Sequence, residues 1–159
     1  MGRTLRYLIF PALCFLGAVA WAGESSNTIA LDELRSLQLK GADFILWDAR
    51  DQTSFELSHI QGATLPLDNA FYKATALFAK GLISEAPDPA QALKNATKAL
   101  DKDRLIVTYC NRNCKASEML GIQLRGLGFT KVKWMEAGLQ TWEEKGYPVT
   151  IGVPKLRES

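Results

Sequence analysis

The sequence predicts an α/β protein with a doubly wound, mainly parallel sheet of five strands and helices on both faces. Apolar runs of strand length alternate along the chain with segments of helical spacing, which is the order typical of a parallel sheet. The runs at 44–47 and 105–107 are continuously apolar, which indicates strands covered on both faces. A composition of 47% hydrophobic and 23% charged residues excludes a disordered tail, a collagen-like fibre and a multi-span membrane protein.

The first part of the chain carries three of the expected strands and two of the expected helices. Leu31, Leu34 and Leu37 form a helical stripe that Gly41 closes. Pro66 stops the third strand, because proline has no N–H group to donate to a ladder. The expected elements are a strand at 28–30, the Leu31 helix, a strand at 44–47, a short helix at 53–57 and a strand at 63–65.

The long connection at 68–101 has the pattern of two helices. Asp88 and Pro89 are typical of an N-cap and a first helical residue. The positions with helical spacing are Phe71, Ala74, Thr75 and Phe78 in the first helix and Leu93, Ala96, Thr97 and Leu100 in the second. Such a connection crosses from one strand to the next, and its length is also compatible with a lid or a docking surface.

The last part of the chain supplies the two remaining strands, at 105–107 and 132–134, and two helices. A core stripe that starts at Ala116 marks the first of these helices, which Gly126 or Gly128 ends. A terminal helix follows at 139–145. Ligands of doubly wound sheets bind outside the carboxyl ends of the strands, so we expect the functional residues there.

The N-terminus has the layout of a secretory signal peptide. Arg3 and Arg6 precede an apolar stretch at 8–20, and an Ala-Trp-Ala cleavage pattern ends the segment. The stretch is too short for a membrane span, which needs roughly 20 residues. We expect a signal peptide at 1–22, a linker at 23–27, a domain at 28–150 and a tail at 151–159. The mature protein is then expected in the periplasm or secreted, without stable membrane insertion.

Charge and cysteine content restrict the partners of the mature chain. Cleavage after Ala22 would remove two arginines and no acid, which takes the formal net charge from +2 to zero. A neutral domain has no net attraction for nucleic acid or anionic lipid, so we expect neither as a partner. Cys110 and Cys114 would then be the only cysteines, too few for a disulfide scaffold. One histidine and two cysteines do not make a structural zinc site, so we expect no metal and no cofactor.

Cys110 is the residue that the pattern selects for chemistry. It directly follows a strand, and a helix is expected to begin near Lys115 or Ala116. A thiol in this place faces the positive end of a helix dipole and free backbone N–H groups, both of which lower its pKa. Arg112 and Lys115 add positive charge nearby. We therefore expect a reactive thiolate beside an anion-binding loop; the alternative is a buried structural cysteine.

Three stretches carry motifs in a fixed order. The loop at 109–115 reads YCNRNCK. The stretch 48–66 contains DAR, Phe55, HIQGA and Pro66, and the stretch 136–149 contains EAGL, Trp142 and GYPV. Together these motifs resemble the active-site loop and the N-terminal and C-terminal signatures of rhodanese-type sulfurtransferases. The resemblance spans about residues 28–150.

The resemblance implies a ping-pong transfer of sulfur through a persulfide. Cys110 would attack the outer sulfur of a small anionic donor such as thiosulfate and pass it to a thiol, a cyanide-like acceptor or a protein. Lys115 would orient the donor, and Asp48, Arg50 and His59 would give structural support. The backbone N–H groups expected to bind substrate and stabilise charge on sulfur are those of Asn111, Arg112, Asn113, Cys114, Lys115 and Ala116.

The length of the loop separates this chemistry from a related one. Phosphatases that resemble rhodaneses carry one extra loop residue, which makes room for phosphate. Here Lys115 falls five positions after Cys110, the shorter spacing, which favours a sulfur-sized pocket. Asn113 stands where a glycine is common, and asparagine tolerates left-handed backbone angles. Ala137 replaces another common glycine.

Cys114 is unusual in such a loop. It lies four residues after Cys110, and a curled loop would bring the two Cα atoms within disulfide range, roughly 4.4–6.8 Å. Cys114 could resolve a persulfide on Cys110 and release sulfide, protect that thiol from over-oxidation, or be incidental. Three hypotheses follow: a sulfurtransferase that uses Cys110, a thiol–disulfide or persulfide redox protein that uses both cysteines, and a non-catalytic binding module.

Overall fold

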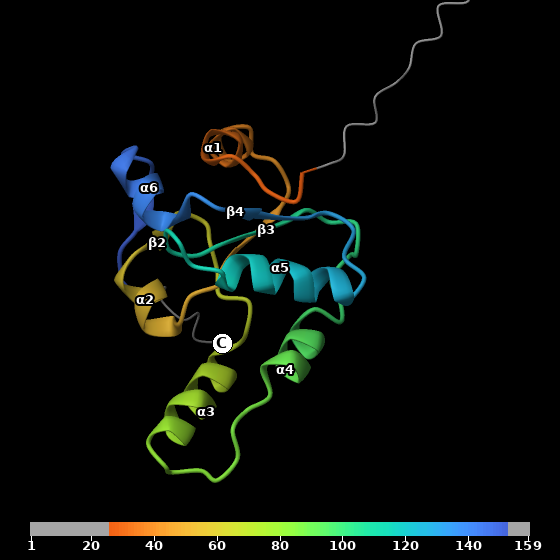
Figure 1. Ribbon diagram of the computed structural model, residues 1–159, viewed down its shortest axis with the longest axis vertical. Helices are drawn as coiled ribbons and strands as arrows, with labels where there is room; N and C mark the ends of the chain where they lie inside the picture. The colour runs from red at the N-terminus through yellow and green to blue at the C-terminus, as the bar shows by residue number, and fades with distance from the viewer. Residues whose placement is uncertain (1–25, 153–159) are drawn as a thin grey trace, which may run out of the picture.

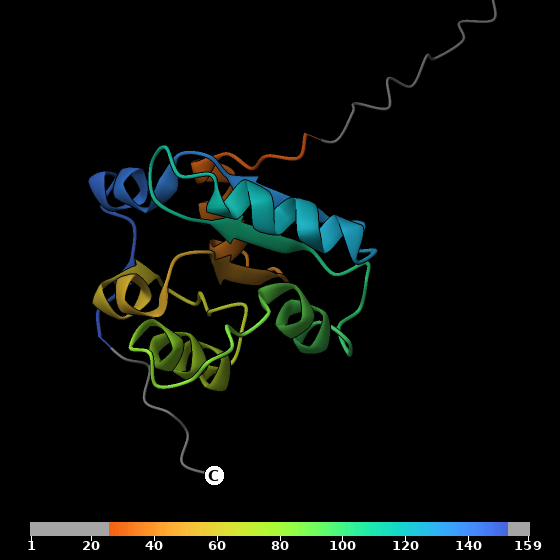
Figure 2. The same ribbon diagram turned by 60° about the horizontal axis from the view of Figure 1, so that its bottom comes forward.

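The structure is a computed structural model that describes residues 26–152. The expected signal peptide at 1–22, the linker residues 23–25 and the tail residues 153–159 lie outside the described residues. Within the described part, no helix is long and apolar enough to cross a membrane. The chain folds in three layers, with a central sheet between two groups of helices (Figures 1 and 2). The predicted α/β class is confirmed.

The central sheet is parallel and has the strand order β1-β3-β4. Its members are β1 (Ile45–Asp48), β3 (Ile106–Tyr109) and β4 (Val132–Met135). At its two edges, Thr28 and Thr64 each add a single parallel bridge. The five expected strands are therefore present as three strands and two isolated bridges in the same sheet.

The two edge segments are short for local reasons. The first helix begins at Leu31, three positions after Thr28, so the segment around Thr28 has no room for a longer strand. Gly62, with φ 84°, and Pro66 confine the segment around Thr64. A second sheet, which the sequence did not predict, pairs β2 (His59–Ile60) with β5 (Val149–Thr150) in antiparallel fashion. Strands of two residues are too short to show an apolar alternation.

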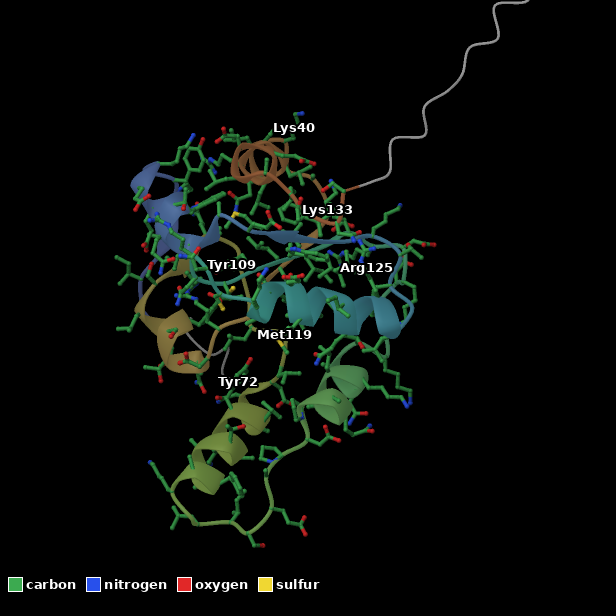
Figure 3. All side chains as sticks on the ribbon, in the orientation of Figure 1. Lys40, Tyr72, Tyr109, Met119, Arg125 and Lys133 are labelled. Atoms are coloured by element: carbon green, nitrogen blue, oxygen red, sulfur yellow. The ribbon has the colours of Figure 1, made fainter. Side chains whose placement is uncertain are left out.

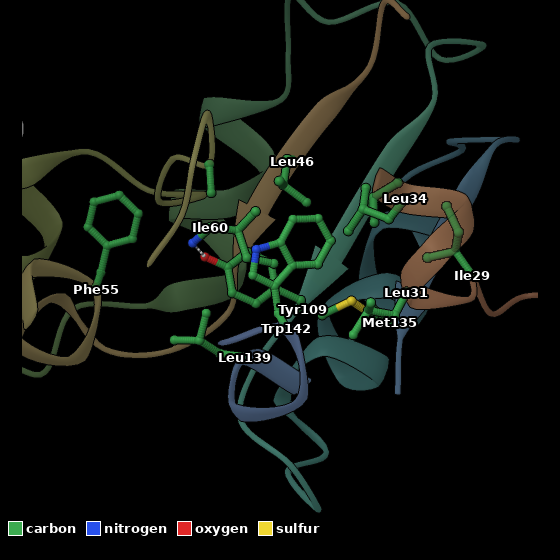
Figure 4. Close-up of a cluster of buried hydrophobic side chains, with 12 residues drawn as sticks. Ile29, Leu31, Leu34, Leu46, Phe55, Ile60, Tyr109, Met135, Leu139 and Trp142 are labelled. Carbon is green, nitrogen blue, oxygen red and sulfur yellow. Dashed lines mark hydrogen bonds between the residues drawn. The ribbon is translucent and has the colours of Figure 1, made fainter. Parts of the chain in front are cut away.

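One face of the central sheet packs against α1 (Leu31–Leu39) and α6 (Gly138–Glu144), and α2 (Gln52–Leu57) joins the same core. Burial of one large apolar side chain contributes roughly 1.5–3 kcal/mol, so this core accounts for much of the fold's stability. The buried members include Leu34, Leu46, Phe55, Ile60, Val107, Tyr109, Met135, Leu139 and Trp142 (Figure 4).

The opposite face packs against α5 (Ala116–Gly126) and α4 (Pro89–Ala96). The strands alternate their side chains between the two faces, as the pleat requires. The buried residues on this side are Trp47, Leu93, Ile106, Leu124, Phe129 and Val132. Helices on both faces confirm the doubly wound arrangement.

The long connection contains α3 (Asn69–Ala79) and α4, as expected. The Asp88 carboxylate accepts hydrogen bonds from two backbone N–H groups at the start of α4, which confirms its N-cap role. The expected continuation of this helix through Leu100 is wrong, because α4 ends at Ala96 and the Thr97 hydroxyl donates to the Leu93 carbonyl. No residue of α3 is buried, and Figure 1 places this helix at the end of the molecule farthest from α1.

A buried carboxylate ties β1 to its neighbours. Asp48, the last residue of β1, has no exposed surface. The hydroxyl of Tyr109 donates to Asp48 Oδ2 at 2.8 Å. The same hydroxyl accepts the N–H of Ile60 at 3.0 Å, the bond drawn in Figure 4. Arg50 donates to both carboxylate oxygens, at 2.9 Å to Oδ1 through Nε and 2.6 Å to Oδ2 through Nη2. The network therefore joins β1, β3 and β2 directly below the carboxyl ends of the strands.

We expect Tyr109→Phe to destabilise the fold by about 1–3 kcal/mol, because it leaves the Asp48 carboxylate and the Ile60 N–H without the hydroxyl in a buried place. Tyr147→Phe is the matched control, because its hydroxyl donates to an exposed carboxylate, that of Asp32, at 2.8 Å. Urea unfolding of both variants measures the difference. Equal losses in the two variants would contradict a special role for the buried network.

Candidate active site

Cys110 lies where β3 ends, and its side chain points into the protein. The residue is buried, with 1% of its surface exposed. Its Sγ lies 3.1 Å from the carbonyl oxygen of Cys114 and 3.3 Å from the hydroxyl oxygen of Ser117. A longer contact, 3.6 Å, joins it to the carbonyl oxygen of Asn111. The thiol is thus enclosed by the loop that follows it and by the first turn of α5.

The loop after Cys110 curls into the N-terminus of α5. The N–H of Cys114 donates to the carbonyl of Asn111 at 3.2 Å, which closes a tight turn. Asn113 is the only non-glycine residue among those described with a positive φ, 61°, in agreement with its place at a common glycine position. The helix begins at Ala116, so the predicted order of strand, cysteine, loop and helix is confirmed.

The prediction of a lowered thiol pKa is wrong for this structure. Burial raises the pKa of the Cys110 thiol, and a hydrogen bond with the Cys114 side chain raises it further. The hydroxyl and the backbone N–H of Ser117 oppose this by lowering the pKa, because they stabilise the thiolate. The sequence correctly predicted a helix N-terminus after Cys110, but it did not predict how deeply the sulfur is buried.

The backbone N–H groups of the loop divide into two sets. Those of Arg112, Cys114 and Ala116 already have acceptors: Gln140 Oε1 at 2.7 Å, the Asn111 carbonyl and Cys114 Sγ at 3.4 Å. The other set consists of the N–H groups of Asn111, Asn113 and Lys115, which have no protein acceptor within residues 26–152. Alternate amides of the loop are therefore available to an anion, rather than the continuous row expected.

The two basic residues of the loop are each paired with an acid on the surface. Arg112 Nη2 lies 2.5 Å from a carboxylate oxygen of Glu144, and Lys115 Nζ lies 2.8 Å from one of Glu118. The Lys115 side chain is 79% exposed, so this pair is screened by solvent and readily exchanged. The two positive charges expected in the loop are present, but each is neutralised by the carboxylate with which it pairs.

Asp48 and Arg50 support the loop from below. In addition to its pair with Asp48, Arg50 donates to the Ser58 carbonyl at 2.5 Å and reaches Asn111 Oδ1 at 3.5 Å. His59 is buried, its ring stacks on Phe55 with centroids 3.8 Å apart, and Nδ1 lies 2.8 Å from the Phe55 carbonyl oxygen. All of these contacts are to protein groups, and the structural role expected for the three residues stays a prediction.

Sequence reasoning missed three residues that shape the site: Ser117, Gln140 and Gly138. Ser117 is buried beside the sulfur, and its carbonyl accepts the Thr108 hydroxyl at 2.8 Å. Gly138 has φ 76°, and a Cβ atom there would fall on the backbone of Arg112. The only sequence signal for these residues was the EAGL motif that contains Gly138, because contacts between distant segments leave no local pattern.

Two cavities flank the loop. One, of about 390 Å³, is lined by Cys114, Ser117 and polar neighbours, including Glu118 and Glu136. The other, of about 380 Å³, is more apolar and lies between the end of β1, the long connection and α5. Tyr72 and Met119 line it from facing sides of α3 and α5 (Figure 3). The 68–101 connection therefore forms one wall of a cavity that reaches Ala116 at the end of the loop.

A family model describes this architecture. The model of the rhodanese-like domain matches residues 30–145, which is most of the chain. The chain belongs to the rhodanese-like domain family. Among curated proteins, none matches its sequence. The family membership confirms the resemblance on which the loop and its two flanking motifs were interpreted.

Solved structures with the rhodanese-like fold are similar to this chain. The rhodanese-like domain of a protein from Anabaena sp. is 23% identical, with a TM-score of 0.58 over 82% of this chain and 83% of that one. A protein from Bacillus halodurans is 22% identical, with a TM-score of 0.58 over 78% and 76%. A thiosulfate sulfurtransferase from Pseudomonas aeruginosa is 17% identical, with a TM-score of 0.54 over 79% of this chain and 20% of that one. At these identities the likeness concerns the fold alone.

We expect Gly138→Ala to disrupt the loop, because its new Cβ atom would overlap the backbone of Arg112 and Asn111. Gly146→Ala is the matched control, since Gly146 also has a positive φ, 69°, but open space where the Cβ would lie. The control should lose about 1–2 kcal/mol through backbone strain alone, and Gly138→Ala clearly more. Thermal unfolding, together with the rate of Cys110 alkylation, measures both effects. Equal stability of the two variants would refute the close contact.

We expect alkylation of Cys110 to accelerate only as the pH rises above the ordinary thiol pKa, because the raised pKa leaves little thiolate at neutral pH. Ser117→Ala should raise the pKa further and slow the reaction at neutral pH about tenfold, which corresponds to about 1.4 kcal/mol for a lost hydrogen bond to a charged group. Trypsin cleavage after Arg112 separates Cys110 from Cys114, so each rate is read by mass. Ser54→Ala is the control, because the half-buried Ser54 hydroxyl on α2 donates to the Asp51 carboxylate and not to a cysteine. A Ser117→Ala profile that matches the control would count against this contact.

Proposed function

We propose that the chain is a sulfurtransferase that moves a sulfane sulfur from a small anionic donor, such as thiosulfate, to a nucleophilic acceptor through a persulfide on Cys110. The observation that carries the proposal is the position of Cys110 at the end of the central strand, inside a loop whose alternate N–H groups are open. Membership of the rhodanese-like domain family supports this position as the reacting one.

The proposed reaction has two half-steps. The thiolate of Cys110 attacks the outer sulfur of thiosulfate, an S–S bond forms on Cys110, and sulfite leaves with the electron pair of the broken bond. An acceptor nucleophile then attacks the sulfane sulfur, and the Cys110 thiolate is the leaving group. No external base is needed once the thiolate has formed, because a sulfur nucleophile is activated by its own ionisation.

The loop supplies the electrostatics of the first half-step. The N–H groups of Asn111, Asn113 and Lys115 would hold the donor's oxygens or the charge that develops on sulfur. Ser117 would stabilise the thiolate as it forms, which offsets part of the effect of burial. Arg112 and Lys115 would leave their ion pairs with Glu144 and Glu118 and bind the anionic donor instead. The change costs little free energy, because exposed ion pairs contribute little to stability.

The short loop favours sulfur over phosphate. Lys115 lies five positions after Cys110, and the loop between them closes through the Cys114–Asn111 hydrogen bond. The Pseudomonas aeruginosa thiosulfate sulfurtransferase has the same fold at low identity, which is compatible with this donor. We further propose that the protein acts in the periplasm or after secretion, on the basis of the segment at 1–22. Its acceptor would be a thiol, a cyanide-like nucleophile or a protein.

We expect Cys110→Ser to abolish sulfite release from thiosulfate with cyanide as acceptor, down to the rate without protein, because no persulfide can form. The measurement is sulfite release, together with intact mass after incubation with thiosulfate in a Cys114→Ser background, where a persulfide on Cys110 has no second cysteine to react with. The chain that retains Cys110 gains sulfur, and the same chain with Cys110→Ser does not. Circular dichroism of the variant checks that the fold is retained. An aryl phosphate serves as the control substrate for phosphatase activity. If the parent chain shows neither sulfite release nor sulfur gain, the non-catalytic binding module is the better description.

A further inference from the structure

The two cysteines of the loop differ sharply in their surroundings. Cys110 is buried, and Cys114 is exposed at the mouth of the site. The Cys110 thiol donates to the carbonyl of Cys114 at 3.1 Å, and the Cys114 side chain is near enough to raise the pKa of the Cys110 thiol. The turn from Asn111 to Cys114 brings the backbone of the second cysteine next to the thiol of the first. The residue that carries the exposed thiol therefore contacts the enclosed thiol through its carbonyl oxygen.

The Cys114 sulfur is held in place by the start of α5. Its Sγ accepts the N–H of Ala116 at 3.4 Å, a contact that holds the side chain at the start of the helix. Cys114 also lines the polar cavity of about 390 Å³, together with Ser117 and Lys115. This cavity gives the second thiol access to solvent and to a reductant, which Cys110 lacks.

We propose that Cys114 resolves the Cys110 persulfide, so that the sulfur leaves as hydrosulfide and the loop is left with a Cys110–Cys114 disulfide. This inference rests on the proposed function, because it needs the persulfide that the first half-step forms. The inference identifies Cys114 as the group that reacts with the persulfide. The two cysteines of the loop supply the electrons that reduce the sulfane sulfur, and a dithiol reductant returns the loop to its reduced state. When no external acceptor takes the sulfane sulfur, the product is then sulfide.

The resolving step balances as a thiol–disulfide exchange. The thiolate of Cys114 attacks Sγ of Cys110, the bond between the two cysteines forms, and the bond from Cys110 Sγ to the sulfane sulfur breaks. The sulfane sulfur leaves with the electron pair and its proton as HS⁻, and it is thereby reduced. The two cysteine sulfurs are oxidised to the disulfide. A dithiol then reduces this disulfide by two successive exchanges and becomes a disulfide itself.

The difference in burial between the two cysteines favours attack by Cys114 over attack by an external thiol. The enclosed Cys110 sulfur is poorly reached by external thiols, whereas the Cys114 carbonyl contacts it from inside the loop and keeps the second cysteine beside it. An intramolecular thiol competes well with a dilute external acceptor, because its effective concentration is high. The disulfide that results bridges the buried and the exposed sulfur, so a reductant can attack the Cys114 side from the cavity.

The test uses the full chain, reduced and then freed of reductant under anaerobic conditions, with thiosulfate added in equimolar amount. Sulfite, sulfide and intact mass are measured for the parent chain, Cys114→Ser and Cys114→Ala. We expect the parent chain to release both sulfite and sulfide and to become lighter by two hydrogens. Both Cys114 variants should release sulfite only and become heavier by one sulfur atom.

Peptide masses locate the bond. Trypsin cleaves after Arg104, Arg112 and Lys115, so Cys110 and Cys114 fall in separate peptides, 105–112 and 113–115. After free thiols are blocked, the proposed disulfide joins these two peptides, and a dithiol separates them again. The added sulfur of the Cys114 variants should lie on peptide 105–112. Cys14 lies in neither peptide and does not interfere with the assignment.

The outcomes separate the two proposals. A parent chain that keeps the extra sulfur and releases no sulfide would overturn the resolving role and leave the sulfurtransferase proposal intact. Sulfur found on peptide 113–115 would overturn it in favour of a relay from one cysteine to the other. If neither the parent chain nor the Cys114 variants release sulfite or gain sulfur, the proposed function itself is wrong and the resolving role falls with it.

Discussion

The buried carboxylate of Asp48 is the constraint on which the rest of the site depends. A charge without exposed surface must be compensated, and Arg50 and Tyr109 do so from two directions. Removal of one partner would leave an uncompensated buried charge, which costs several kcal/mol in comparable pairs. The same interaction fixes the ends of β1 and β3 relative to each other. Cys110 directly follows Tyr109, so the position of the thiol is set by this carboxylate.

The loop is then held from two further sides. Arg50 extends from the carboxylate to Asn111, and α6 approaches closely enough that only glycine fits at 138. The N–H of Leu139 donates to the Cys110 carbonyl at 2.9 Å, and Gln140 accepts the N–H of Arg112. These contacts fix the backbone of the loop before any substrate binds, so little ordering is required on binding. Some of the loop's hydrogen-bond capacity is used for this rigidity, and the alternate N–H groups remain for an anion.

Burial and reactivity oppose each other at Cys110. Enclosure protects the sulfur from solvent and oxidants, but it raises the thiol pKa and limits contact with large acceptors. Ser117 recovers part of the thiolate's stability, and Cys114 offers a second sulfur at the surface. On the proposed mechanism, the chemistry is divided between an enclosed sulfur and an exposed one. A lone buried cysteine would have to perform both half-steps with the same atom.

The sequence by itself determined the fold class, the order of the helices and of the central strands, and the place of Cys110 between a strand and a helix. Continuous apolar runs and helical spacing are local properties of the sequence. The residue types of Asp88, Pro89 and Asn113 likewise predict the backbone conformation at their own positions. The strand–cysteine–loop–helix order then placed Cys110 at the carboxyl end of the sheet. Only the tertiary structure decided the reduction of two expected strands to bridges, the end of α4 at Ala96 and the raised pKa of Cys110. Enclosure of the sulfur, the pairing of loop cations with Glu118 and Glu144, and the fit of Gly138 depend on contacts between distant segments, which no local pattern records.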